Sequence, residues 1–284
     1  MIRIETMHAL RDTLRTAVAA GHRVRFVPTV GALHDGHASL IRTARADGGF
    51  VLVSDFVNPT QFGPAEDFAR YPRTPDDDVV CAAAAGADAI WFPRVDDIYP
   101  PGDGTRVAVG AMGSVWEGAH RPGHFDGVAT VVAKLLAATQ AGVIYLGEKD
   151  FQQTVIVRQL VRDLLFTTEV VMAPTVREAD GLALSSRNRY LSIDDRAAAV
   201  AIWRGLRAAA GLAEQGERDA ALVRRALHDA IGAEPRVHLQ YAELVDPVTL
   251  EPVHRLDTPA RAIVAALVGT TRLIDNVLLL PSSP

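Results

Sequence analysis

Short apolar runs alternate with longer amphipathic segments through the first 176 residues of the chain. Five β-prone apolar runs predict strands at residues 24–27, 50–56, 89–92, 143–146 and 168–173. Apolar positions three or four residues apart predict helices at residues 38–46, 76–85, 125–138 and 151–165. This alternation is typical of a parallel sheet covered on both faces. We therefore expect a Rossmann-like, doubly wound α/β domain over residues 1–176, opened by a packing helix within residues 1–21.

The pattern changes beyond Ser192. Two helical segments, at residues 194–215 and 217–231, are followed by β-like runs at residues 237–245, 260–268 and 272–279. This order predicts a smaller α+β domain over residues 177–284, which is a candidate lid over a site in the first domain. Trp203, Leu206 and Leu212 have the spacing of core positions in its first helix.

Composition excludes several classes of protein. With 284 residues, 49% of them apolar, the chain can bury a sizeable core in one or two domains. A net charge of −5 with scattered basic residues argues against nucleic acid as a partner. No apolar run is long enough to span a membrane, so we expect no membrane association. The single cysteine, Cys81, excludes an internal disulfide, and its apolar helical setting argues against a catalytic thiol.

The stretch PTVGALHDGH, residues 28–37, follows the first predicted strand and leads into a helix. Free backbone N–H groups at a helix start form a natural anion site. Gly31 and Gly36 let the backbone approach a ligand closely. His34 and His37, three residues apart, can both reach one phosphate chain, and the alternative is that they are structural residues.

A loop with the sequence FVNPTQFGP, residues 56–64, follows the second strand. Asn58 and Gln61 can offer amide groups to a substrate with hydroxyl and carboxylate groups. An Asx-type turn explains Asn58 equally simply.

Three acids, Asp76 to Asp78, lie in the first turn of the next predicted helix, directly after Thr74 as its N-cap and Pro75 at its first position. Helix capping explains them, and a Mg²⁺ role for Asp77 or Asp78 is the alternative. Further along, the segment WEGAHRPGHF, residues 116–125, is rich in Gly, His and Arg, and we interpret it as a mobile segment near the site.

The sequence GEKD, residues 147–150, ends the fourth strand. Lys149 can meet a phosphate there, Asp150 a ribose hydroxyl, and Gln153 a substrate one turn further on. Asp150 can also be a helix N-cap. Lys149 and Lys134 are the only lysines among 29 basic residues, so each can be present for its compact ammonium group or by chance.

A last polar cluster follows the fifth strand, within residues 174–188. Ser185, Ser186 and Arg187 form a second candidate phosphate site, because two adjacent hydroxyls stand beside a guanidinium.

These blocks, in this order, resemble the pantothenate synthetase (pantoate–β-alanine ligase) family of the H-x-G-H nucleotidyltransferase-like α/β superfamily. The resemblance is densest over residues 28–192. It implies a ligase that condenses (R)-pantoate with β-alanine, using ATP and Mg²⁺, through a pantoyl adenylate. It further implies a cytoplasmic homodimer.

The resemblance also implies site residues. His37 is the proton donor, with His34, Lys149, Ser185 and Arg187 as further catalytic groups. Gln61 contacts pantoate and β-alanine, and Gln153 contacts pantoate. The implied ATP contacts are Val30, Gly31, Ala32, Leu33, His34, Asp35, Gly36, His37, Gly147, Glu148, Lys149, Asp150, Val176, Leu184, Ser185, Ser186 and Arg187.

Two positions depart from the family pattern. Val30 stands where the family usually has Met, and Asp55 stands where it usually has an aliphatic residue. A carboxylate close to anionic substrates adds repulsion unless it is paired. Two other functions stay open: transfer of a nucleotidyl group to a phosphorylated acceptor, and nucleotide binding without turnover.

Overall fold

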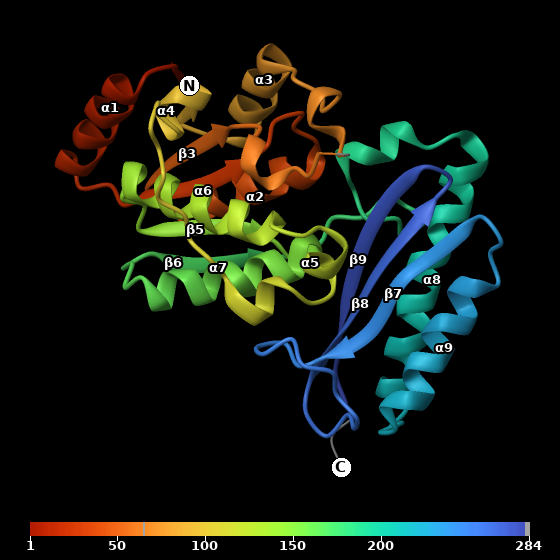
Figure 1. The fold of residues 1–284 in the computed structure, drawn as a ribbon. Coiled ribbons are helices and arrows are strands. Elements are labelled where there is room, and N and C mark those ends of the chain that lie inside the picture. Colours follow the sequence, from red (N-terminus) through yellow and green to blue (C-terminus); the bar gives the residue numbers. More distant parts are fainter. Residues whose placement is uncertain (65, 282–284) are drawn as a thin grey trace. The chain divides into compact units, whose positions relative to one another are not determined.

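The chain folds into two units in this computed structural model, which describes residues 1–64 and 66–281. The first unit comprises residues 1–148 and 153–174, and the second comprises residues 149–152 and 175–284. Most of the helices and strands of both units are labelled in Figure 1.

The first unit is built on six parallel strands in the order β1-β4-β3-β2-β5-β6. They are β1 (Ile2–Ile4), β2 (Val24–Thr29), β3 (Phe50–Asp55), β4 (Ala89–Trp91), β5 (Val143–Gly147) and β6 (Glu169–Ala173). The five strands expected from the sequence are confirmed, and β1 is an addition at the sheet edge. The chain runs outward from β2 through β3 and then returns to β5 on the other side of β2. This reversal is the place where doubly wound sheets bind ligands.

Helices cover both faces of this sheet. They are α1 (Met7–Ala19), α2 (Asp35–Ala46), α3 (Pro75–Ala85), α4 (Val95–Ile98), α5 (Glu117–His120), α6 (His124–Thr139) and α7 (Phe151–Asp163). Buried residues of α1, α6 and α7 form one apolar cluster with alternate strand residues, and those of α2 and α3 form another. In β3, for example, Leu52 belongs to the first cluster and its neighbours Val51 and Val53 to the second. Burial on both faces explains the nearly continuous apolar runs in the sequence.

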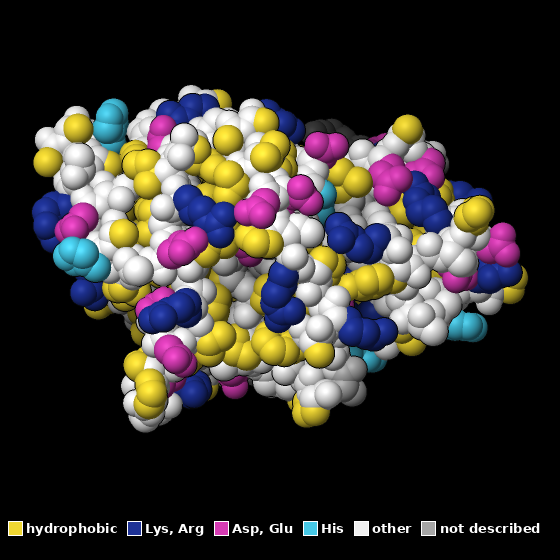
Figure 2. Space-filling view, turned by 90° about the horizontal axis from the view of Figure 1, so that it is seen from above, with side chains coloured by type: hydrophobic (Ala, Val, Ile, Leu, Met, Phe, Trp, Pro, Cys, Tyr) yellow, Lys and Arg dark blue, Asp and Glu magenta, His cyan; other side chains and the backbone are white. Residues whose placement is uncertain are grey.

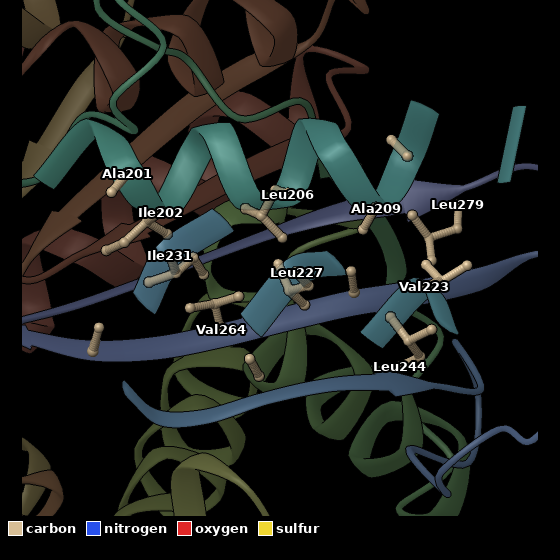
Figure 3. Packing of buried hydrophobic residues seen from close by; sticks show 14 of the residues in the cluster. Ala201, Ile202, Leu206, Ala209, Val223, Leu227, Ile231, Leu244, Val264 and Leu279 are labelled. Carbon is tan, nitrogen blue, oxygen red and sulfur yellow. The ribbon is translucent and has the colours of Figure 1, made fainter. Parts of the chain in front are cut away.

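The second unit packs two helices on an antiparallel sheet of three strands. Its elements are α8 (Ile193–Glu214), α9 (Ala220–Gly232), β7 (Val237–Val245), β8 (Ala260–Val268) and β9 (Thr271–Leu279). Side chains from both helices and the sheet meet in one core, in which Leu206 is fully buried (Figure 3). Trp203 and Leu212 pack at its margin. The predicted α/β class with a smaller α+β part is confirmed.

The surface agrees with the composition. On the face shown in Figure 2, basic and acidic side chains are interspersed. Within residues 1–64 and 66–281, no helix has both the length and the apolar character that a membrane crossing requires.

Candidate active site

The H-x-G-H stretch lies where β2 passes into α2, beside the reversal of the strand order between β2 and β5. His34 is the N-cap of α2, and its Nδ1 accepts a hydrogen bond from the Gly36 N–H at 3.1 Å. His37 returns the contact, because its Nδ1 accepts from the His34 N–H at 3.3 Å. The two histidines thus form a reciprocal capping box, a role usually filled by Ser or Thr with Glu. The sequence left open a structural and a functional role for His34 and His37, and the capping box establishes the structural role.

The same contacts fix the ring tautomers. Since both Nδ1 atoms accept hydrogen bonds, each neutral ring carries its proton on Nε2. The ring centroids lie 4.1 Å apart with an interplanar angle of 36°. Two neighbouring imidazoles of this tautomer each carry an N–H donor at one helix start, which is an arrangement suited to a polyanion.

The backbone amides of this stretch are largely engaged within the chain. Gly31 donates to Thr29 Oγ1 at 3.3 Å, while Ala32 and Leu33 donate to the two carboxylate oxygens of Asp78 at 3.0 and 2.6 Å. The amides of His34 and Gly36 serve the capping box described above. The expectation that free amides here bind an anion is therefore wrong for these five groups, and the imidazoles are the stronger candidates.

Gly31 has a different neighbour from the one expected. Its φ is +79°, and a Cβ built on it would lie 2.4 Å from a carboxyl oxygen of Asp55. The missing side chain therefore makes room for Asp55. Ala32 follows with φ of +50°, a conformation that costs energy for a residue other than glycine. Two hydrogen bonds from neighbouring amides to Asp78 hold this turn.

Asp55 is paired, which answers the question raised by its presence. Its carboxyl hydrogen-bonds that of Asp78, which is 1% exposed. Burial and the neighbouring Asp78 together raise the pKa of Asp55 to about 7. A proton on Asp55 relieves the repulsion that two carboxylates would otherwise have.

The carboxylate of Asp78 is occupied by contacts within the chain, whereas a Mg²⁺ role for the exposed Asp77 stays a prediction. Both oxygens of Asp78 accept backbone amides, and one also accepts the Thr74 hydroxyl at 3.3 Å. Asp77 is exposed in the first turn of α3. Within the described part of the chain, no three His, Cys, Asp or Glu side chains are grouped to hold a metal ion. Thr74 is confirmed as the N-cap of α3, although its hydroxyl donates a hydrogen bond to Asp78 and makes none to a backbone amide.

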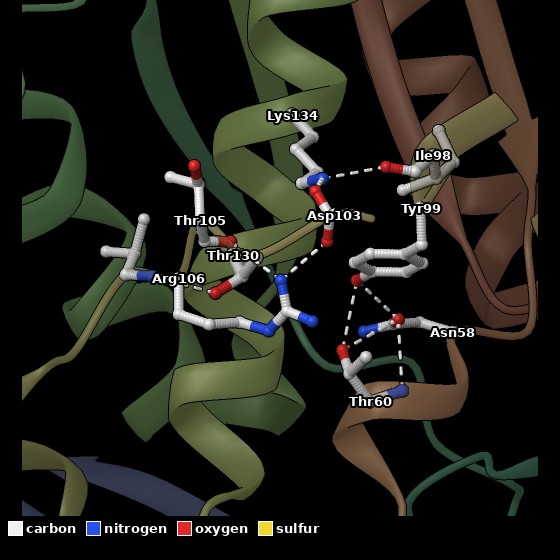
Figure 4. Close-up of polar contacts among 10 residues, drawn as sticks. Asn58, Thr60, Ile98, Tyr99, Asp103, Thr105, Arg106, Thr130 and Lys134 are labelled. Carbon is white, nitrogen blue, oxygen red and sulfur yellow. Dashed lines mark hydrogen bonds and ion pairs between the residues drawn. The ribbon is translucent and has the colours of Figure 1, made fainter. Parts of the chain in front are cut away.

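Asn58 organises a turn. It is 1% exposed and is the N-cap of the 3₁₀ helix η1 (Pro59–Gln61). Its Oδ1 accepts from the Thr60 amide, the Thr60 hydroxyl and the Tyr99 hydroxyl, at 3.3, 3.0 and 2.8 Å (Figure 4). Its Nδ2 donates to Gln61 Oε1 at 3.1 Å and to the Gly127 carbonyl at 3.3 Å. The contact from the Thr60 amide is the Asx-turn alternative, and the others tie this turn to Tyr99, Gln61 and Gly127.

Gln61 is directed by that turn. Because its Oε1 accepts from Asn58, the amide NH₂ of Gln61 is the part available to a ligand. Gly127 allows this packing, since a Cβ there would lie 2.3 Å from the Thr60 carbonyl oxygen.

Residues from the segment 116–125 hold Gln61 from the other side. The Arg121 guanidinium donates to both Glu66 oxygens, at 2.8 and 2.6 Å, and to the Gln61 carbonyl at 3.3 Å. Arg121 Nη1 also lies 3.1 Å from His124 Nε2. Because a guanidinium can only donate, His124 Nε2 accepts this bond, and His124 Nδ1–H donates to the Gln61 carbonyl at 2.8 Å. Burial, with the charge of Arg121, lowers the pKa of His124 to about 4. These contacts fasten the segment to η1, a role that its interpretation as a mobile segment did not include.

The two lysines have different surroundings. Lys134 of α6 donates to the Ile98 carbonyl at 2.8 Å and pairs with Asp103 (Figure 4). Lys149 belongs to the second unit, in the 3₁₀ turn η4 (Glu148–Asp150), and its Nζ lies 3.4 Å from Asp150 Oδ1. Lys134 is therefore held in a structural ion pair.

A buried network fixes the main chain of Lys149. The Asn276 Nδ2 of β9 donates to the Lys149 carbonyl at 3.0 Å, and Asn276 Oδ1 accepts from Arg261 at 2.9 Å. The neighbouring Asp275 binds Arg177 through two parallel bonds of 2.6 and 2.9 Å. The turn that carries Lys149 is thus tied to the sheet of the second unit.

The last predicted cluster lies on a short hairpin of the second unit. The Leu184 amide donates to the Val176 carbonyl at 3.0 Å, which places these two implied ATP contacts opposite each other. Ser185 then caps the 3₁₀ helix η5 (Ser186–Tyr190), and its Oγ accepts from the Arg187 amide at 3.3 Å. Ser185, Ser186 and Arg187 therefore lie in one turn, and their role as a phosphate site stays a prediction.

The remaining predicted residues lie at strand and helix ends of the first unit. Gly147 ends β5, opposite Ala173 of β6. Gln153, partly buried, lies in the first turn of α7.

Comparison with known proteins identifies consistent relatives. The Pantoate-beta-alanine ligase family model matches residues 2–278. A pantothenate synthetase of Rubrobacter xylanophilus is 52% identical over 278 residues, covering 95% of this chain and 96% of the relative. A pantothenate synthetase structure from Thermus thermophilus has 47% identity and a TM-score of 0.94, covering 99% and 100% of the two chains. A pantoate-beta-alanine ligase from Francisella tularensis, in complex with beta-gamma ATP and beta-alanine, has 35% identity and a TM-score of 0.81, covering 98% and 97%.

Proposed function

This chain belongs to the pantoate-beta-alanine ligase family and is an ATP-dependent ligase that joins pantoate to β-alanine; we propose that it does so through an enzyme-bound pantoyl adenylate. The observation that carries the assignment is the family match over residues 2–278, which includes every polar cluster described above. The relative in complex with beta-gamma ATP and beta-alanine supports the two substrates.

In the first step, the pantoate carboxylate attacks the α-phosphorus of ATP and pyrophosphate leaves. The substrate supplies its own nucleophile, so the protein needs to align the reactants and to stabilise the charge that develops on the leaving group. The Nε2–H groups of His34 and His37 suit this role, because their tautomers are set before the substrate arrives. We assign His37 as the proton donor to the leaving group and His34 as its neighbour on the same phosphates.

In the second step, the β-alanine amine attacks the acyl carbon of the adenylate. AMP leaves with the electron pair of the acyl–oxygen bond, and the amine loses a proton. We assign the amide of Gln61 to both pantoate and β-alanine and the amide of Gln153 to pantoate. Asn58, Arg121 and His124 hold Gln61 in place, and Asn58 is itself a further proposed substrate contact.

The second unit contributes further proposed ATP contacts. Lys149 and Arg187 supply positive charge, and Ser185 and Ser186 supply hydroxyl groups, for a polyphosphate. Asp150, Val176 and Leu184 of the second unit, like Val30 to Gly36, Gly147 and Glu148 of the first unit, stay proposed contacts that rest on the family resemblance.

Three properties of the relatives' family are included in the proposal. Mg²⁺ enters with the phosphates of ATP. The protein is a homodimer of the cytoplasm. Sedimentation at several protein concentrations tests the dimer.

A product assay tests the function. We expect release of AMP and pyrophosphate when pantoate, β-alanine and ATP are all present, and pantoate-dependent exchange of label between pyrophosphate and ATP without β-alanine. A stable nucleotidylated acceptor would establish the nucleotidyl-transfer alternative instead. ATP binding without turnover under all conditions would leave a binding protein.

Cys81 provides a prediction about what the reaction does not use. Burial, with the charges of Asp78 and Asp35, raises the pKa of its thiol, so the reactive thiolate is scarce at neutral pH. We expect Cys81→Ala to retain a ligase rate close to that of the original protein, measured as AMP formation. A loss of more than about tenfold, for a variant that unfolds at the same temperature, would contradict this and would give the thiol a part in catalysis.

A further inference from the structure

The turn that leads into His34 is supported by side chains from two distant elements. Asp55 is the last residue of β3 and pairs in register with Thr29, the last residue of β2. Asp78 comes from the first turn of α3. Both carboxyls therefore lie at the carboxyl end of the sheet, beside the residues that connect β2 to α2.

The contacts divide the work between the two acids. Asp78 holds the backbone, through the amides of Ala32 and Leu33 at 3.0 and 2.6 Å. Asp55 fills the space left by Gly31, where a Cβ would meet all three atoms of its carboxyl group within 3.3 Å. Its carboxyl hydrogen-bonds that of Asp78. Since both oxygens of Asp78 already accept backbone hydrogen bonds, the proton of the pair is held by Asp55.

We propose that Asp55 is a positioning residue of the ligase, whose protonated carboxyl donates to Asp78 and thereby fixes the turn that presents His34 and His37. This inference rests on the proposed function of those histidines. Ala32, at φ of +50°, needs external support to keep its conformation. Asp55 completes that support, because an ionised Asp55 would repel the buried carboxylate of Asp78.

Because the pKa of Asp55 is raised, the contribution of this residue to stability depends on pH. At a folded pKa of about 7 against an ordinary value of 3.8, the folded protein holds a proton that the unfolded chain has released. The contribution of Asp55 to stability is therefore full below about pH 4 and is lost as pH rises through about 7. The other titratable or charged groups on the loop and on helices α2 and α3 are His34, Asp35, His37, Arg42, Arg45, Asp76, Asp77 and Cys81.

Three variants test the proposal. Asp55→Asn keeps the shape and a donor toward Asp78 but cannot ionise, whereas Asp55→Leu removes the donor. Asp76→Asn is the matched control. Asp76 is an exposed acid of α3, the helix that carries Asp78, and its carboxylate pairs with Arg3. Thermal unfolding confirms that each variant folds.

Rates provide the first measurement. We expect Asp55→Leu to lower kcat about a hundredfold with little change in the KM for ATP, as for a misplaced catalytic group. We expect Asp55→Asn to restore most of that rate and to lose the decline in rate that the original protein and Asp76→Asn show above about pH 7. Identical pH profiles for the original protein and Asp55→Asn would overturn the proposal.

Infrared difference spectra provide a measurement independent of activity. A carboxylic acid C=O band should be present near pH 6 in the original protein, should disappear through about pH 7, and should be missing from Asp55→Asn. Persistence of the band in Asp55→Asn would overturn the proposal. If the band behaves as expected but no ligase activity is found, the proposed function fails and the proton assignment stands.

Discussion

Replacement of His37 by alanine is expected to slow pantoyl adenylate formation by about two to three powers of ten, the usual effect of losing one transition-state donor. His37 Nε2–H is the donor in question, because Nδ1 is occupied by the His34 amide. The alanine variant also loses half of the capping box, so its free energy of unfolding should fall by about 1 kcal/mol. Pantoate-dependent exchange of label between pyrophosphate and ATP measures the rate, and thermal unfolding measures the stability.

His37→Asn separates the two roles. An asparagine oxygen can take the place of Nδ1 and accept from the His34 amide, but the shorter side chain has no group at the position of Nε2. We expect this variant to regain the stability lost in His37→Ala and to stay as slow. A rate near that of the original protein in His37→Asn would show that His37 serves only as a helix cap.

Replacement of Lys149 by methionine is expected to reduce adenylate formation by a similar factor of about two to three powers of ten. The ammonium group is lost, whereas the main-chain bond from Asn276 to the Lys149 carbonyl does not depend on the side chain. The turn should therefore keep its shape. Single-turnover formation of the adenylate at saturating pantoate measures the effect.

Lys134→Met is the matched control for this variant. The two lysine side chains have similar exposure, 23% for Lys134 and 21% for Lys149, but Lys134 is committed to Asp103 and the Ile98 carbonyl. The control should lower the unfolding temperature and leave adenylate formation unchanged. Equal losses of rate in both variants would remove Lys149 from the proposed chemistry.

The strands and helices were predictable wherever burial imposed a period on the sequence. The predicted strands at residues 237–245 and 260–268 match β7 and β8 to the residue. By contrast, β1 has only three residues and is specified by pairing with β4, nearly 90 residues away, so no local pattern reveals it. The α2 helix starts at Asp35, before its apolar period begins at residue 38. The sequence did not reveal this start because a histidine capping box lies outside the usual cap signals.

The site was predictable as a set of turns but not as a set of contacts. His34 and His37 stand at a strand–helix junction, as expected, yet the amides around them are used by Asp78, which is more than 40 positions further on. Asp55 was noticed as an unusual residue, although its partner could not be identified from spacing. Arg121 and Glu66 were missed individually, and the concentration of His, Gly and Arg in residues 116–125 was the signal available.

The short turn Lys149–Gln152 interrupts the first unit in sequence but folds with the second. The polypeptide consequently crosses from one unit to the other three times, and no single cut separates them. A fragment starting at Thr175 would lack Phe151, whose ring lies 4.4 Å from the guanidinium carbon of the buried Arg261. It would also lack the carbonyl that Asn276 binds. Dissection, fusion or permutation of this protein must therefore carry that tetrapeptide along with the C-terminal part.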